Sequence, residues 1–188
     1  NITSINDDPA IRVKANSHVH IENSNITGSS SGYEAIWLWN NGSIMLQGTS
    51  SVTAPSGTSA ISLTTASSAV LIDDVQINSV DQTAIYIDKN SVVELNDNVA
   101  VTRSDGNDEI FVDPSSALRI NGSDITLANV GCEGITSYVQ VGNNNSVNIS
   151  KTCNGYQNLI PNFVEITSGT CESNGYSYVI SEHECSLY

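Results

Sequence analysis

The sequence has few basic side chains, with six Lys and Arg against 20 Asp and Glu in 188 residues and a formal net charge of −14. A protein that binds phosphate groups needs a cationic face, so this balance argues against nucleic acid as a partner. It argues equally against binding to an anionic membrane surface. The longest strongly apolar run, residues 35–39, is far too short to span a bilayer, so no membrane insertion is expected.

Large apolar and charged side chains are also scarce. The chain holds two Phe, two Trp and one Met, and only 14% of its residues are charged. Its surface must therefore be built from hydroxyl and amide groups, and its core from Ile, Val, Leu and Ala. The β-branched residues among them, Ile and Val, favour strands, and no segment shows the 3.6-residue period of a helix. An all-β fold follows.

Pairs of apolar residues with one residue between them recur every 24 or 25 positions. The first set of pairs is Ile11/Val13, Ile36/Leu38, Ile61/Leu63, Ile85/Ile87 and Ile110/Val112. A second set follows eight and ten residues after the start of each first pair, at Val19/Ile21, Ile44/Leu46, Ala69/Leu71, Val93/Leu95 and Leu118/Ile120. A third, single apolar site comes next, at Ile26, Val52, Ile77, Val101 and Ile125.

Three short strands in about 25 residues predict a parallel β-solenoid, because the strands repeat too closely for an intervening helix. The crossover preference of parallel strands favours a right-handed coil. We expect the pattern to continue at Val139/Val141 with Val147/Ile149, after a 29-residue step, and again at Val164/Ile166. The whole coil would then have about seven rungs of ~25 residues.

The turn after each first strand repeats as well. Five residues beyond the first apolar position stand Asn16, Asn41, Ala66, Asn90, Ser115 and Asn144. Asparagine tolerates the left-handed backbone of a tight turn and can hydrogen-bond to an asparagine in the next rung. We therefore expect a stacked ladder at this corner.

These rungs and their asparagine turns resemble the right-handed parallel β-helices of the pectate-lyase-like superfamily. The hydroxyl-rich sequence of residues 26–32 also resembles bacterial autotransporter passengers and other surface adhesins. The resemblance covers roughly residues 10–168 and is one of repeat style, so it implies a fold more than a function. We interpret 1–9 as an N-terminal cap or partial rung, 10–168 as the β-helix and 169–188 as a C-terminal cap, in one domain.

All four cysteines fall in the last 57 residues: Cys132, Cys153, Cys171 and Cys185. Their even number and the secreted-looking composition favour two disulfides in an oxidising, extracellular compartment. Three pairings are open, and proximity in sequence favours Cys132–Cys153 with Cys171–Cys185.

Outward residues of successive first strands should form straight columns along the rod. One column is Arg12, Trp37, Ser62, Tyr86, Phe111, Gln140 and Glu165, and the other is Lys14, Trp39, Thr64, Asp88, Asp113, Gly142 and Thr167. Exposed aromatic rings stack on sugar faces and are enriched at interfaces between proteins. A binding or self-association surface at Arg12, Trp37, Trp39, Tyr86 and Phe111 is one interpretation, and cover by another part of the chain is the other.

Asp88 and Asp113 occupy equivalent positions in adjacent rungs, so their carboxylates could approach within ~5 Å. Two close carboxylates raise one pKa or recruit a cation. The resemblance places calcium ligands or catalytic acids on this face, which makes the pair a candidate for catalysis or calcium binding. The basic residues of these columns, Arg12 and Lys14, lie about three rungs from the pair, roughly 14 Å away. The hydrolase signatures of the superfamily are absent as well, so we expect no enzyme and no obligatory cofactor.

We therefore expect a non-enzymatic extracellular or cell-surface structural or adhesive β-solenoid, including the subunit of a self-assembling filament or layer. Its partners would be further copies of itself, or a surface glycan or protein. The alternative is a protein that binds or cleaves polysaccharide through the aromatic column with Asp88 and Asp113.

Overall fold

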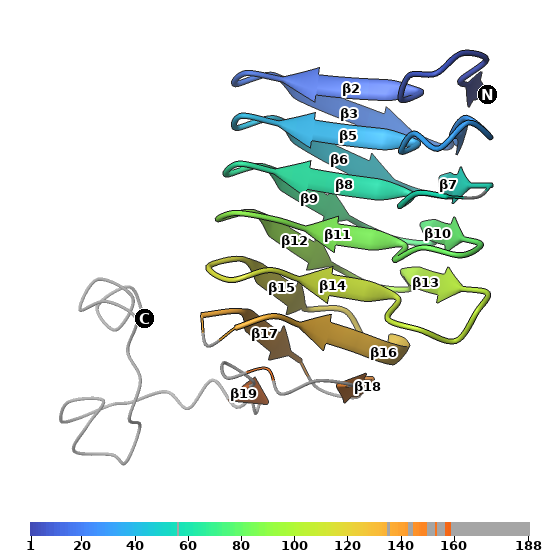
Figure 1. Cartoon of the computed structure of the whole chain (residues 1–188). Coiled ribbons are helices and arrows are strands. Elements are labelled where there is room, and N and C mark those ends of the chain that lie inside the picture. The colour runs from blue at the N-terminus through green and yellow to red at the C-terminus, as the bar shows by residue number, and fades with distance from the viewer. Residues whose placement is uncertain (56, 135, 143–144, 150–152, 154–156, 159–188) are drawn as a thin grey trace, which may run out of the picture.

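The computed structural model describes residues 1–55, 57–134, 136–142, 145–149, 153 and 157–158. In this part of the chain all regular structure is β-strand, and the strands lie in three parallel sheets (Figure 1). None of these residues belongs to a helix that could cross a membrane. The all-β prediction is confirmed.

Each sheet collects one strand from each turn. Sheet A contains β1 (Ile2–Thr3), β4 (Asn25–Thr27), β7 (Ser51–Ala54), β10 (Gln76–Ser79) and β13 (Ala100–Arg103). Sheet B contains β2 (Ile11–Lys14), β5 (Ile36–Trp39), β8 (Ile61–Thr64), β11 (Ile85–Ile87), β14 (Ile110–Val112), β16 (Thr126–Cys132) and β18 (Ser146–Ile149). Sheet C contains β3 (His18–Glu22), β6 (Ser43–Gln47), β9 (Ser68–Leu71), β12 (Val92–Leu95), β15 (Ala117–Ile120), β17 (Tyr138–Val141) and β19 (Gln157–Asn158).

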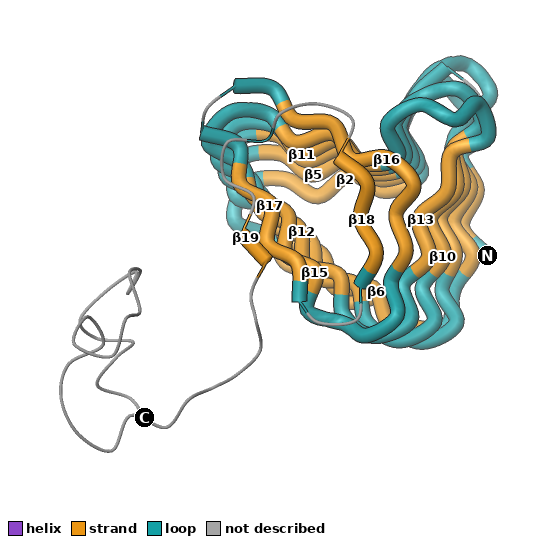
Figure 2. Tube along the Cα trace, turned by 90° about the horizontal axis from the view of Figure 1, so that it is seen from below, coloured by secondary structure: helices purple, strands orange, loops and turns teal. Residues whose placement is uncertain are grey.

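The chain winds as a right-handed coil through sheets B, C and A in turn (Figures 1 and 2). The described residues make about six turns rather than the seven predicted. The fifth turn is already shorter than the first four, with 20 residues from Ile110 to its sheet-B partner Val130. The last predicted repeat, Val164/Ile166, lies outside the described residues. Figure 2 looks along the rod and shows the three sheets enclosing a core.

The core consists of the inward residues that the repeat predicted. Ile11, Ile36 and Ile61 stand at one level of successive first strands, and Val13, Leu38 and Leu63 at the next. The central isoleucines and leucines of these columns are completely buried. One turn alone could not bury them, so stacking of the turns stabilises each strand.

The corner between sheets B and C has the left-handed backbone that the turn pattern predicted. The residues with positive φ at the predicted position are Asn16, Asn41, Ala66, Asn90 and Ser115. Asn41 donates a hydrogen bond from Nδ2 to Oδ1 of Asn16 at 3.2 Å. Buried serines continue the ladder one residue on, where the Ser67 amide donates to Ser91 Oγ at 3.2 Å. Asn144 lies outside the described residues.

The sixth turn departs from the predicted register. Val130 and Cys132 pair with Ile110 and Val112 in sheet B, only 20 residues later. The predicted first strand at Val139/Val141 instead pairs with β15 in sheet C, and Val147/Ile149 lies in sheet B. The cause is the long strand β16, which enters sheet B without a preceding loop, so the fifth turn has no separate third strand between β15 and sheet B.

A disulfide joins Cys132 to Cys153, as predicted, with 5.2 Å between their Cα atoms. Both residues are buried at the lower end of the core. Cys171 and Cys185 lie outside the described residues.

Candidate functional site

The outward face of sheet B carries two straight columns of side chains. The first column is Arg12, Trp37, Ser62, Tyr86, Phe111 and Gly131. The second column is Lys14, Trp39, Thr64, Asp88, Asp113 and Glu133. Neighbours in a column stand about 4.8 Å apart, the spacing of paired strands. We call this surface the B face.

The upper end of the B face is cationic and aromatic. The Trp37 and Trp39 rings stack with centroids 5.8 Å apart. The Arg12 guanidinium lies 4.9 Å from the Trp37 ring centroid, and Lys14 Nζ lies 5.8 Å from that of Trp39. Arg12 is also paired with Asp8 at 2.7 Å. The two indoles thus contact each other and a cation each. Trp39 is 39% exposed.

Small residues occupy the middle of the B face. Ser62 points outward between Trp37 and Tyr86, yet it is only 6% exposed because its larger neighbours in the column stand on either side. Thr64, beside it in the second column, donates a hydrogen bond to the Leu38 carbonyl at 3.2 Å. Ser62 and Thr64 therefore fill the single rung between the two indoles and Tyr86.

The lower end of the B face combines aromatic rings with carboxylates. The Tyr86 and Phe111 rings are parallel, with centroids 5.7 Å apart. Tyr86 donates a hydrogen bond from its hydroxyl to Asp113 Oδ2 at 2.9 Å. Burial, followed by the hydrogen bond to Asp113 and the charges of the nearby carboxylates, raises the pKa of Tyr86 to about 12.

Asp88 and Asp113 come together as the sequence predicted. Burial raises the pKa of Asp88, and the hydrogen bond and negative charge of Asp113 raise it further. Lys89 lies beside Asp88 and acts in the opposite direction. Its φ of 44° places it in the turn, past the end of strand β11. The pair thus favours a shared proton or a bound cation over two full negative charges.

Two residues at this end were missed because of the wrong register. Glu133, not Gly142, follows Asp113 in the second column, and Gly131, not Gln140, follows Phe111 in the first. Gln140 instead lies opposite Arg119 in sheet C. A side chain at position 131 would clash with the Asp108 carboxylate and with Phe111. In the sequence, two apolar residues with one residue between them, Val130-Gly131-Cys132, are the pattern from which this register could have been predicted. Glu165 and Thr167, also predicted in the columns, lie outside the described residues.

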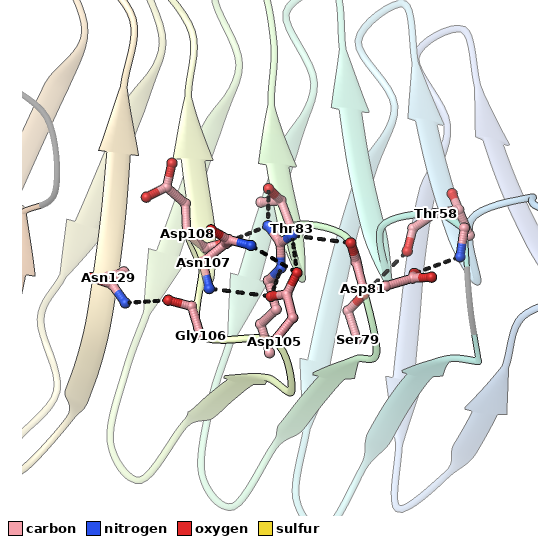
Figure 3. Close-up of polar contacts among 11 residues, drawn as sticks. Thr58, Ser79, Asp81, Thr83, Asp105, Gly106, Asn107, Asp108 and Asn129 are labelled. Carbon is pink, nitrogen blue, oxygen red and sulfur yellow. Dashed lines mark hydrogen bonds and ion pairs between the residues drawn. The ribbon is translucent and has the colours of Figure 1, made fainter.

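Loops between sheets A and B stand out on one side of the B face (Figure 2). We call the four that follow β4, β7, β10 and β13 the A–B loops; their described residues are 28–35, 55, 57–60, 80–84 and 104–109. Arg103, at the end of β13, contacts two of them, and its partners Asp81, Asp105 and Asp108 are labelled in Figure 3. Its guanidinium donates to the Asp81 carbonyl at 3.0 Å and the Asp108 carbonyl at 3.3 Å, and it pairs with the Asp105 carboxylate at 2.6 Å.

Further hydrogen bonds connect the A–B loops along the rod. The Gly57 amide donates to Asp81 Oδ1 at 2.6 Å, and the Asn129 side chain donates to the Gly106 carbonyl at 3.1 Å. Asp105 accepts from the Asn107 amide within its own loop. The loops at 57–60, 80–84 and 104–109 are thus hydrogen-bonded to one another, and the last of them to β16, in a wall beside the B face.

The chemistry available to the B face is stacking, ion pairing and hydrogen bonding. Among the described residues no group of three or more His, Cys, Asp or Glu side chains is arranged to hold a metal ion. Arg12 and Lys14 stand three rungs from Asp88, roughly 14 Å away at the strand spacing. A proton abstraction beside the carboxylate pair would need a base closer than these.

Comparisons with protein-family models, with curated proteins and with solved structures found no match. The fold defines the chain as a parallel β-solenoid, and the relationship to the pectate-lyase-like superfamily or to autotransporter passengers stays a prediction.

Proposed function

We propose that this chain is a non-enzymatic extracellular or cell-surface adhesive β-solenoid that binds a carbohydrate on the B face. The observation that carries the proposal is two stacked aromatic pairs on one outward sheet face, Trp37 with Trp39 and Tyr86 with Phe111, separated by the rung of Ser62 and Thr64. Sugar rings present apolar faces that stack on such side chains. The A–B loops flank the face on one side, which favours an elongated ligand along the rod.

The polar groups of the B face can supply the hydrogen bonds that aromatic stacking does not provide. Carbohydrate sites combine apolar surface with a few fixed hydrogen-bonding groups. Tyr86 and Asp113 are held by their mutual hydrogen bond, and Thr64 is held by the Leu38 carbonyl. Such preorganised groups lose little conformational entropy when they bind a ligand.

An extracellular location is consistent with the Cys132–Cys153 disulfide, because disulfides persist in oxidising compartments. A non-enzymatic role is supported by the surroundings of Asp88 and Asp113, where the adjacent cation, Lys89, belongs to the turn.

The test is binding to a panel of immobilised and soluble polysaccharides by the wild type and by a Trp37→Ala/Trp39→Ala variant. We expect a binding polysaccharide to be found and its affinity to fall at least about tenfold in the variant. Tyr138→Ala is the matched control, since Tyr138 is an outward aromatic residue on sheet C. Equal binding by wild type and double variant, with both folded by circular dichroism, would contradict the proposal.

Self-association is the second candidate function. Lys14 stands at one end of the second column, and Asp113 and Glu133 stand at the other, so the face is complementary to an antiparallel copy of itself. Light scattering over a concentration series distinguishes the two functions. Mass that rises with concentration and falls in the Trp37→Ala/Trp39→Ala variant would identify an assembling subunit.

A further inference from the structure

The two ends of the B face differ in charge. Arg12 and Lys14 occupy the first rung, and Arg12 is already paired with Asp8. Rungs four to six instead carry the carboxylates Asp88, Asp113 and Glu133 in one column. A ligand that lies along the face therefore meets a strongly negative environment at its Tyr86–Phe111 end.

The carboxylates gather around the aromatic pair rather than away from it. Asp113 accepts the Tyr86 hydrogen bond at 2.9 Å, and Asp88 is within hydrogen-bond reach of Asp113. Both aspartates are partly buried, so their charges are less screened than those of exposed side chains. Aromatic faces attract cations, and neighbouring carboxylates add to that attraction.

The A–B loops add charge of the same sign. Asp108, from the loop before β14, places its carboxylate in the space that Gly131 leaves beside Phe111. Lys89 is the cation next to Asp88, and it lies in the turn at the edge of the face. Carboxylates thus border the aromatic pair from the second column and from the loop.

We propose that the Tyr86–Phe111 end of the B face binds the protonated amine of an amino-sugar residue and disfavours uronic acids. The inference rests on the proposed carbohydrate-binding function and specifies its ligand class. An ammonium group there would lie against the ring pair and offset the repulsion between Asp88 and Asp113. A uronate would instead add a fifth carboxylate to the four of Asp88, Asp108, Asp113 and Glu133 and be repelled.

The experiment compares three oligosaccharides of equal length at neutral pH: glucosamine, N-acetylglucosamine and galacturonate oligomers. Calorimetry on the full chain should show the glucosamine oligomer binding about fivefold more tightly than its acetylated counterpart, with the galacturonate oligomer weakest. In Asp88→Asn/Asp113→Asn the preference for the amine should disappear, while affinity for the acetylated oligomer is retained. Asparagine keeps an oxygen that can accept the Tyr86 hydrogen bond, so the variant should fold.

Asp97→Asn is the matched control for loss of a carboxylate, because Asp97 is an exposed turn residue outside sheet B. It should leave the amine preference unchanged. Equal affinities for the amino and acetylated oligomers, or a preference that survives in the double variant, would overturn this inference and leave carbohydrate binding standing. Failure of all three oligomers and of the polysaccharide panel would overturn both.

Discussion

Tyr86 and Asp113 lie in adjacent turns of the coil, 27 residues apart, and are joined by a 2.9 Å hydrogen bond from the tyrosine hydroxyl to Oδ2 of the aspartate. The pairing of strands β11 and β14 makes the bond possible. It places Tyr86 beside Phe111, and Asp113 follows Phe111 two residues later in the chain. It connects the aromatic and acidic parts of the B face.

This bond predicts an abnormal titration of Tyr86. Its pKa is raised to about 12, first by burial and then by the hydrogen bond and charge of Asp113. The phenolate absorbance of wild type minus that of Tyr86→Phe should therefore titrate near pH 12, and Asp113→Asn should move the midpoint toward 10. Because the raised pKa favours the neutral form in the folded state, its stabilising contribution is complete below pH 10 and is lost as the pH rises through 12. A midpoint near 10 in the wild type would contradict the geometry.

Arg103 should matter more for stability than other arginines. Its side chain is 11% exposed and binds two loop carbonyls and Asp105, so Arg103→Gln should lower the free energy of unfolding by about 2–3 kcal/mol. Arg119→Gln is the control, because Arg119 forms an exposed pair with Glu94 that is worth under ~1 kcal/mol. Urea denaturation measures both changes, and equal losses would contradict the role of Arg103 in the A–B loops.

Asp105 reports on the same contact. Its hydrogen bond from Arg103 lowers its pKa from 3.8 to about 2. The ionised carboxylate therefore contributes stability above pH 3.8 that is lost as the pH falls through about 2. Carboxyl titration by NMR should show the low pKa in the wild type and a higher one in Arg103→Gln, where the hydrogen bonds from Asn107 still hold it below 3.8.

Glu109 occupies the position that alanine fills in the four preceding turns, and it is 8% exposed. Its carboxylate accepts from the amides of Ala128 and Asn129, near the register shift in β16. Glu109→Ala would leave these amides without that acceptor, and we expect a loss of about 1–3 kcal/mol. Glu109→Gln keeps an acceptor and should lose less, as measured by urea denaturation.

The two Glu109 variants also separate charge from hydrogen bonding. Burial raises the pKa of Glu109 above its ordinary 4.5, so stability is complete below pH 4.5 and falls as the pH rises through the higher folded value. This part of the pH dependence should be absent in Glu109→Gln. An unchanged pH profile in that variant would show that the carboxyl group does not titrate as expected.

Loss of the Cys132–Cys153 disulfide should destabilise the lower end of the coil. The bond spans 21 residues and includes β17 and β18. Cys132→Ala/Cys153→Ala should lower the free energy of unfolding by about 2–4 kcal/mol, chiefly by freeing the unfolded chain. Peptide mapping of the oxidised wild type checks the pairing directly, and a Cys132–Cys171 peptide would contradict it.

The repeat in the sequence was enough to predict the first five turns. Ile11, Ile36, Ile61, Ile85 and Ile110 are evenly spaced because each begins the same strand in the same sheet. The B face followed from their outward neighbours, including the Asp88–Asp113 pair. Spacing alone could specify these features because each turn repeats the local contacts of the one above.

The sixth turn could not be predicted in the same way. No loop precedes its sheet-B strand, and Asn129-Val130 stands where the first four turns have Ala-Ile and the fifth has Glu109-Ile110. The role of Arg103 was also missed, because its partners Asp81 and Asp108 come from two different loops. Loop conformation depends on such contacts rather than on period.

Because the first turns have nearly constant length, the number of turns between two side chains of the B face sets the distance between them along the rod. Inserting one complete copy of a 25-residue turn at Ser62 would move Trp37 away from Tyr86 by about 4.8 Å and leave the local contacts at both ends intact. An insertion that is not a whole turn would rotate one end and break both columns. Duplication or deletion of single turns is therefore a simple evolutionary route by which the reach of this face could be matched to longer or shorter ligands.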